Sequence, residues 1–167
     1  MEEKTTNLEE RPWWFWVDEG VGELLKQSLA MITEVPEWSE KYHDYSFVVF
    51  PAAKAYEGFL KKLFFEMGFI NSEQYTGKRF RIGKALNPFL DRELRASESV
   101  YDRVTRYCGG KELADKLWDT WIHCRNVLFH WFPDEKNVIT FEEAKKRTLE
   151  ILEAMNAAFA GCELAKK

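Results

Sequence analysis

The chain of 167 residues is poor in cysteine and lacks a long apolar run. Its three cysteines, Cys108, Cys124 and Cys162, are an odd number and lack the paired spacing of zinc ligands, which argues against a disulfide scaffold and a metal site. No apolar stretch approaches the roughly 20 residues that a membrane-spanning helix needs. Met1 begins an acidic segment that does not resemble a secretory signal. We therefore expect a cytoplasmic protein with no membrane span and no metal.

Motifs of several common enzyme classes are also missing. The sequence has no Gly-rich phosphate loop, no Gly-x-Ser-x-Gly nucleophile elbow and no His-Glu-x-x-His zinc helix. His43 and His123 have no partner at metal-ligand spacing. We expect no cofactor.

The chain also lacks an excess of positive charge, since its net charge is −4. This value argues against a protein whose whole surface binds nucleic acid. The charge is uneven, however, because the segment from Gly77 to Lys111 contains nine basic and four acidic residues, a net charge of +5. Such a basic face fits a phosphate groove or an acidic protein partner, and the alternative is a solvated surface of charged helices.

What the chain does have is apolar residues at helical spacing almost throughout. The pattern predicts an all-α fold in one domain, residues 1–167, with four to five main helices and an insertion of short helices. Pro51 is expected either to kink a helix or to begin a new one. Phe50, just before it, is expected on the buried side of the helix at 45–67. The aromatic tract Trp13–Trp16 is too apolar to leave in water, and an anchoring role is favoured over ligand stacking. The expected helices span residues 18–33, 45–67, 82–86, 88–95, 97–107, 111–131 and 140–161.

Three polar residues interrupt the apolar helix expected at 111–131. Asn126 and His130 are four residues apart and share a face, whereas Arg125 and His130 point about 140° apart on an ideal helix. Pro133 ends the helix at about Trp131, which leaves His130 in its last turn. One interpretation is structural, with Arg125 paired to an acid, Asn126 bonded to a carbonyl and His130 capping the helix end. The other is functional, because a charge among aromatic rings needs a partner or a task.

The segment from Arg125 to His130 resembles the Arg-x4-His signature of the HEPN superfamily, which has a polar residue after the arginine. An acid ahead of a basic run on an earlier helix, Glu57 before Lys61 and Lys62, resembles the HEPN domain of RNase LS-type toxins. Glu66 is the second candidate for this acid, and a surface pair with Lys61 is the structural alternative for Glu57. The resemblance covers about residues 45–160 and excludes an aromatic-rich extension at residues 1–17.

The resemblance implies a HEPN-like helical bundle that acts as a metal-independent endoribonuclease, in a toxin or an antiviral-defence effector. It implies that His130 is the general acid or base and that Arg125 holds the scissile phosphate. Asn126 would then orient His130 or the phosphate, and Glu57 would fix Arg125 or share in proton transfer. The basic residues expected to bind RNA are Lys78, Arg79, Arg81 and Lys84.

HEPN sites are commonly built where two copies meet, so the resemblance also implies a homodimer. Trp131 and Phe132, and the tract Trp13–Trp16, are the residues expected near its interface. The alternative function is a non-catalytic HEPN-like interaction module that binds an antitoxin or a partner nuclease through its basic face. A third idea is a nucleotide-binding bundle in which the aromatic tract stacks a base.

Overall fold

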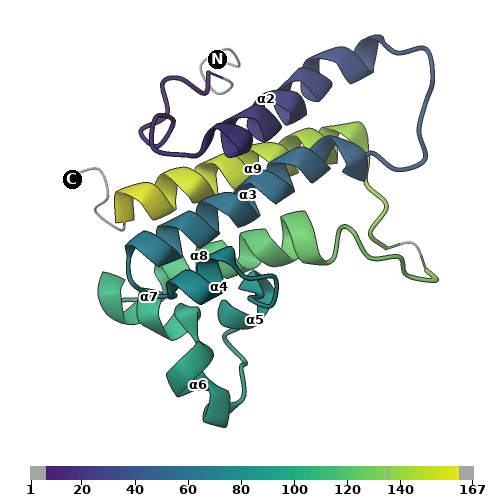
Figure 1. The fold of residues 1–167 in the computed structure, drawn as a ribbon. Helices are drawn as coiled ribbons and strands as arrows, with labels where there is room; N and C mark the ends of the chain where they lie inside the picture. Colours follow the sequence, from purple (N-terminus) through teal and green to yellow (C-terminus); the bar gives the residue numbers. More distant parts are fainter. Residues whose placement is uncertain (1–6, 135, 162–167) are drawn as a thin grey trace.

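A computed structural model describes residues 7–134 and 136–161, and these residues form helices joined by loops, with no strand among them (Figure 1). The predicted all-α fold is therefore confirmed. The elements are α2 (Glu19–Glu34), the 3-10 turn η1 (Val35–Glu37), α3 (Ser46–Glu66), α4 (Ser72–Thr76), α5 (Ile82–Ala85), α6 (Arg92–Glu98), α7 (Val100–Cys108), α8 (Glu112–Trp121), the π-helical segment η2 (Ile122–Asn126) and α9 (Phe141–Gly161).

The longest helices pack side by side, with α3 in contact with both α2 and α9 (Figure 1). Helix α8 packs on α9, and the short helices α4 to α7 form the predicted insertion between α3 and α8. The central element is α3 rather than the 111–131 segment, because α3 supplies eleven buried residues and α8 supplies four. Small residues such as Ala52 and Ala55 let neighbouring helices approach α3 from more than one side.

Two positions of helix α3 were open or wrongly predicted. Pro51 lies inside a continuous helix, in its second turn, so it does not begin a new helix. Phe50 was expected on the buried side, but 53% of its surface is exposed. The reason is helical geometry: Phe50, Lys54 and Glu57 lie at spacings of four and three residues and share the polar face of α3.

The helix predicted to reach Trp131 ends earlier. Regular α-helix stops at Trp121, and η2 follows, in which the N–H of Val127 donates to the carbonyl of Ile122, 3.0 Å away and five residues back. The chain then turns, and Leu128 enters the core. His130 therefore lies beyond the helix and not in its last turn.

The aromatic tract before α2 is anchored on the bundle, as predicted. Trp13 is fully buried, and its Nε1 donates to Oδ1 of Asn156 in α9 at 2.6 Å. Nε1 of Trp16 donates to Oε2 of Glu66 in α3 at 2.9 Å. Only Phe15 in this tract is strongly exposed, at 91%. Most side chains of the tract thus pack against helices of the same chain.

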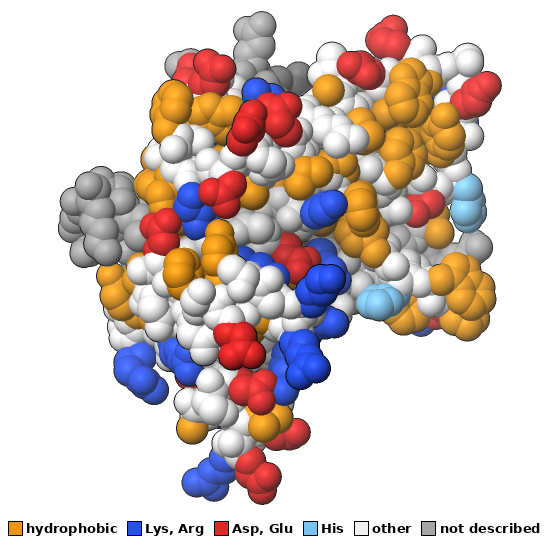
Figure 2. Space-filling model, in the orientation of Figure 1, with side chains coloured by type: hydrophobic (Ala, Val, Ile, Leu, Met, Phe, Trp, Pro, Cys, Tyr) orange, Lys and Arg blue, Asp and Glu red, His pale blue; other side chains and the backbone are white. Residues whose placement is uncertain are grey.

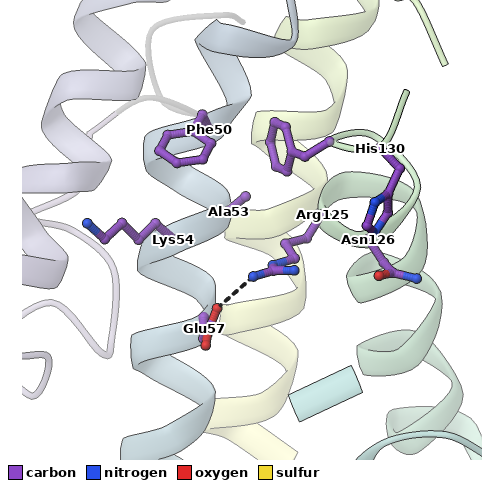
Figure 3. A pocket seen from close by; sticks show the side chains of 8 residues that line it. Phe50, Ala53, Lys54, Glu57, Arg125, Asn126 and His130 are labelled. Atoms are coloured by element: carbon purple, nitrogen blue, oxygen red, sulfur yellow. Dashed lines mark hydrogen bonds and ion pairs between the residues drawn. The ribbon is translucent and has the colours of Figure 1, made fainter. Parts of the chain in front are cut away.

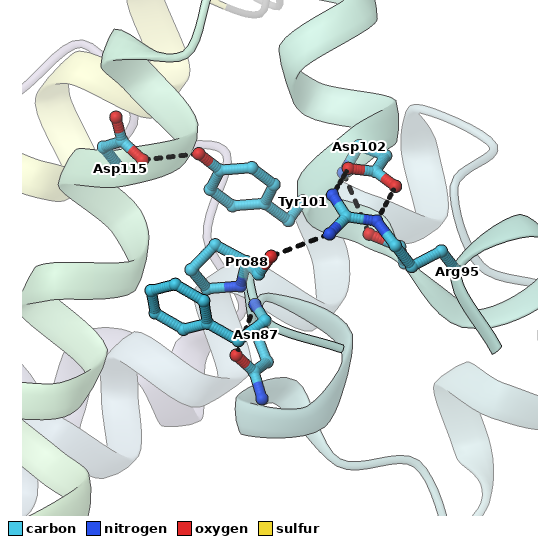
Figure 4. A network of polar contacts seen from close by, with 8 residues as sticks. Asn87, Pro88, Arg95, Tyr101, Asp102 and Asp115 are labelled. Carbon is cyan, nitrogen blue, oxygen red and sulfur yellow. Dashed lines mark hydrogen bonds and ion pairs between the residues drawn. The ribbon is translucent and has the colours of Figure 1, made fainter. Parts of the chain in front are cut away.

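A polar network holds the insertion together (Figure 4). Arg95 of α6 binds both carboxylate oxygens of Asp102 in α7 and donates to the carbonyl of Pro88 at 2.8 Å. This contact keeps Pro88 in a turn, so the helix predicted at 88–95 begins at Arg92 instead. Tyr101 donates to Oδ1 of Asp115 at 2.5 Å and so ties α7 to α8.

None of the helices in residues 7–134 and 136–161 is long and apolar enough to cross a membrane.

Replacement of Trp13 by alanine should lower the free energy of unfolding by about 3 to 5 kcal/mol, because it empties a fully buried aromatic site and leaves Asn156 without its donor. Phe15→Ala, two residues away, should change it by about 0.5 kcal/mol or less, since Phe15 is exposed. Urea denaturation of both variants measures the difference. Equal effects would contradict the anchoring role of Trp13.

The stability of the insertion should fall at alkaline pH. Burial, and then the hydrogen bond to Asp115, raise the pKa of Tyr101 from 10.0 to about 12. The folded state holds this proton more tightly than the unfolded state, so the contribution is complete below pH 10.0 and is lost as the pH rises through about 12. Tyr101→Phe should cost about 1 kcal/mol at pH 8, and the deficit should close by pH 12. Tyr107→Phe, at an exposed site, is the control, and a constant deficit for Tyr101→Phe would refute the assignment.

Candidate functional site

A cavity of about 310 Å³ opens between one face of α3 and the end of the α8–η2 helix (Figure 3). We call it the site cavity. Helix α3 contributes four lining residues at spacings of three or four, η2 contributes two, and the turn after η2 contributes two more. All four residues predicted to be catalytic are among them. The lining residues are Phe50, Ala53, Lys54, Glu57, Arg125, Asn126, Phe129 and His130.

Arg125 is held from two sides. Its Nη2 lies 3.3 Å from Oε2 of Glu57 on α3. Its guanidinium carbon lies 4.9 Å from the ring centroid of Trp121, one turn back on α8. Glu57 is therefore the partner of Arg125, and the pair with Lys61 is not the arrangement found. The Arg125 side chain is still 40% exposed, which leaves N–H donors for a ligand in the cavity.

The π-helical segment explains how Arg125 and His130 reach the same cavity. On a regular helix they would point about 140° apart. The wider i+5 hydrogen bond at Val127 changes the rotation along η2, and the chain then leaves the helix before His130. A turn closed by the N–H of His130 on the carbonyl of Val127, at 3.3 Å, brings the imidazole back to the cavity.

The His130 imidazole does not cap the helix end, because His130 lies in the turn beyond it. The amide of Asn137 donates to the carbonyls of Leu128, at 3.4 Å, and of His130, and so closes this turn. The interpretation of His130 as the cap is therefore wrong. Within the described part of the chain, neither the His130 imidazole nor the Asn126 amide makes a hydrogen bond. Both groups are free to bind a ligand.

Cys124, next to Arg125, points to the other side. Its side chain is fully buried, and Sγ lies 3.5 Å from Oε2 of Glu150 on α9. Burial and then the Glu150 carboxylate raise the pKa of this thiol far above its usual value, so it stays protonated. Cys124 is thus part of the core, and no cysteine is among the residues that line the site cavity.

Sequence reasoning missed Lys54 and Phe129, and it placed Phe50 in the core. Lys54 is exposed, and in Figure 3 its side chain runs from α3 away from Arg125 and His130, so its ammonium group lies on the rim. Lys54 lies three residues before Glu57, and this helical spacing could have predicted that the two share a face of α3. Glu66, the second candidate acid, bonds to Trp16 and does not line the cavity.

The lining of the cavity contains two cationic side chains, Lys54 and Arg125, and one carboxylate, Glu57. This excess of positive charge favours an anionic ligand.

The basic residues Lys78, Arg79, Arg81 and Lys84 do not line the site cavity. They belong to α5 and the loop before it, and Figure 2 shows Lys and Arg side chains gathered over this part of the face. Lys84 pairs with Glu98 at 2.5 Å, and Nη1 of Arg81 donates to the carbonyl of Lys78 at 2.6 Å.

Helix α5 nevertheless borders the site through one indole ring. A Cβ atom at Gly83 would lie only 2.7 Å from Nε1 of Trp121, so α5 packs directly on the ring that supports Arg125. Trp121 thus lies between α5 and Arg125, although the indole itself does not line the site cavity.

Among the described residues, no group of three or more His, Cys, Asp and Glu side chains is arranged to hold a metal ion. The chemistry available at the site cavity is that of a guanidinium, an ammonium group at the rim, an imidazole, an amide and a carboxylate.

Gly83→Ala should lower the free energy of unfolding by about 1 to 3 kcal/mol, because the added methyl group displaces the buried Trp121 indole. It should also disturb Arg125, which rests on that indole. Gly20→Ala on α2 is the matched control, since no atom lies within 4 Å of its added Cβ. Chemical denaturation and tryptophan fluorescence of the two variants test this. A Gly83→Ala protein as stable as Gly20→Ala would contradict the close packing.

Comparisons of the chain with protein-family models, with curated proteins and with solved structures found no match. The HEPN resemblance therefore stays a prediction from the residues of the motif.

Proposed function

We propose that this chain is a metal-independent endoribonuclease of the HEPN type that acts as a toxin or an antiviral-defence effector. One observation carries the proposal: Arg125, Asn126 and His130, the residues of the resembled motif, meet Glu57 around a single open cavity. The spacing on an ideal helix would have separated them. Their meeting depends on a local π-helical segment, and such segments occur frequently at functional sites.

The residues suit cleavage of RNA through its own 2′-hydroxyl group. His130 accepts the proton of the 2′-hydroxyl, or donates one to the leaving 5′-oxygen, as the 2′-oxygen attacks the phosphorus. Arg125 binds the phosphate and stabilises the additional negative charge of the transition state. Glu57 holds the guanidinium in place, and Asn126 orients the imidazole or the phosphate. The products are a 2′,3′-cyclic phosphate and a free 5′-hydroxyl, and no metal is needed.

A homodimer would complete this chemistry. One proton must leave the 2′-hydroxyl and another must reach the 5′-oxygen, and each chain offers one histidine at the cavity. Exposed apolar side chains flank His130, namely Val127 at 39%, Trp131 at 77% and Phe132 at 39%. They offer a surface on which a second copy could pack. The tract Trp13–Trp16 contributes less than expected, because Trp13 and Trp16 are used within the chain.

The basic segment gives the RNA strand a route beyond the cavity. Lys78, Arg79, Arg81 and Lys84 lie in α5 and the loop before it, and α5 packs on the Trp121 ring that supports Arg125. In this proposal they bind phosphates next to the cleaved one, and they bind without reading sequence. Lys84 would exchange its partner Glu98 for a phosphate.

The alternative is a non-catalytic interaction module that binds an antitoxin or a partner nuclease through the basic face. The ion pair between Arg125 and Glu57 favours it, because this arginine already has a carboxylate partner. The net charge of −4 favours it as well.

Cleavage of a labelled mixed-sequence RNA in the presence of EDTA distinguishes the nuclease from the non-catalytic interaction module. Arg125→Ala and His130→Ala should each lower the rate by at least about 100-fold, because each removes a group that acts on the reacting phosphate. His123→Ala, an exposed histidine outside the site cavity, should leave the rate unchanged.

Circular dichroism checks that all variants are folded, and the product ends are analysed for the cyclic phosphate. If the wild type is folded and leaves the RNA intact, the nuclease proposal fails and the interaction module takes its place. Equal cleavage by wild type and both site variants would assign the activity to a contaminant.

A further inference from the structure

Phe50 is the most exposed phenylalanine of the central helix. Phe59 and Phe64 are fully buried and Phe65 is 39% exposed, whereas 53% of Phe50 is exposed, and Phe50 lines the site cavity. Aromatic side chains are common in the lining of ligand-binding pockets. Figure 3 places Phe50 along α3 from Glu57, above the ion pair with Arg125.

Phe50 is supported on one side by Phe129 of the turn after η2. The two ring centroids are 5.3 Å apart and the planes meet at 80°, an edge-to-face contact. This contact fixes the Phe50 ring, and the exposed fraction leaves part of the ring open to the cavity. A rigid, open aromatic ring is the feature on which proteins stack unpaired nucleobases.

The other lining groups match the remaining parts of a nucleotide. Arg125 offers a phosphate ligand, Lys54 at the rim offers a second cation, and the free Asn126 amide can both donate to a base edge and accept from it. Phe50 and Glu57 are seven residues apart, about 10 Å along the helix axis, which is close to the reach of one nucleotide from base to phosphate.

We propose that Phe50, backed by Phe129, is a stacking platform for the nucleobase adjacent to the phosphate bound by Arg125. The inference rests on the proposed ribonuclease function for the identity of that phosphate. It narrows the substrate to single-stranded or looped RNA, because a base stacked on Phe50 is no longer paired in a duplex. Lys54 binds the backbone on the same side.

The test uses short single-stranded oligonucleotides with 2′-O-methyl groups, which lack the nucleophile and cannot be cleaved. Each carries the fluorescent base 2-aminopurine, whose emission falls when it stacks. A second series replaces the same base with an abasic sugar. Affinities are measured for the wild type, Phe50→Ala, Phe50→Trp and the control Phe15→Ala, which removes another exposed phenylalanine that does not line the cavity.

Phe50→Ala should bind about 5- to 150-fold more weakly and lose the quenching, while Phe50→Trp and Phe15→Ala should bind like the wild type. The abasic change should weaken binding to the wild type but not to Phe50→Ala, because the two changes remove the same contact. A paired duplex of the same sequence should bind much more weakly.

Three results would overturn the platform: no binding by the wild type, an abasic penalty that is the same with and without Phe50, or conversion of a dimer to a monomer by Phe50→Ala in light scattering. The last result would assign Phe50 to an interface between copies. These outcomes are independent of cleavage, so a wild type that binds through Phe50 but leaves RNA intact would refute the nuclease and keep the platform.

Discussion

The structure depends on the packing of α3 against α2 and α9. Small residues make this packing possible: Ala52 and Ala55 are fully buried, and a Cβ atom at Gly58 would lie 2.9 Å from Val21 of α2. Because this packing fixes the rotation of α3, it also fixes which residues remain outside. Phe50, Lys54 and Glu57 are the residues left on the free face, and they form one wall of the site cavity. One face of α3 therefore packs in the core, and the opposite face lines the site cavity.

The second wall comes from a departure from regular helix. In η2 the hydrogen bond spans five residues and Cys124 remains in the core. The chain then leaves the helix in a turn whose carbonyls accept from the Asn137 amide. The result is an arginine held by Glu57 and Trp121 beside an imidazole and an amide that no described residue binds. The Arg125 guanidinium is thus held in place before a ligand binds, whereas the His130 imidazole and the Asn126 amide can reorient toward a ligand.

Apolar periodicity was sufficient to predict the main helices, and the Thr140 cap of α9 is present, with Oγ1 3.2 Å from the N–H of Glu143. Periodicity could not predict the end of the 111–131 helix, because the π segment carries the same apolar residues as a regular helix would. It also misplaced Phe50, since an apolar residue on a polar face looks like a core residue. The motif named Arg125, Asn126 and His130, and the resemblance named Glu57, whereas Lys54 was missed and its place at the cavity depends on the fold. The basic segment could be counted from the sequence, whereas its border with Trp121 depends on long-range packing.

The contact between Trp13 and Asn156 joins residues 143 positions apart, and Trp16 packs on Phe159 in the same helix. During synthesis the aromatic tract emerges from the ribosome long before α9 exists. Its indole rings therefore have no partner on α9 until nearly all of the described chain has been made, so the bundle cannot close progressively from its amino-terminal end. Until then Trp13 and Trp16 can contact Phe59 of α3 but lack their partners on α9. The site, which depends on α3 and η2 being held by α9, is assembled at the same late step.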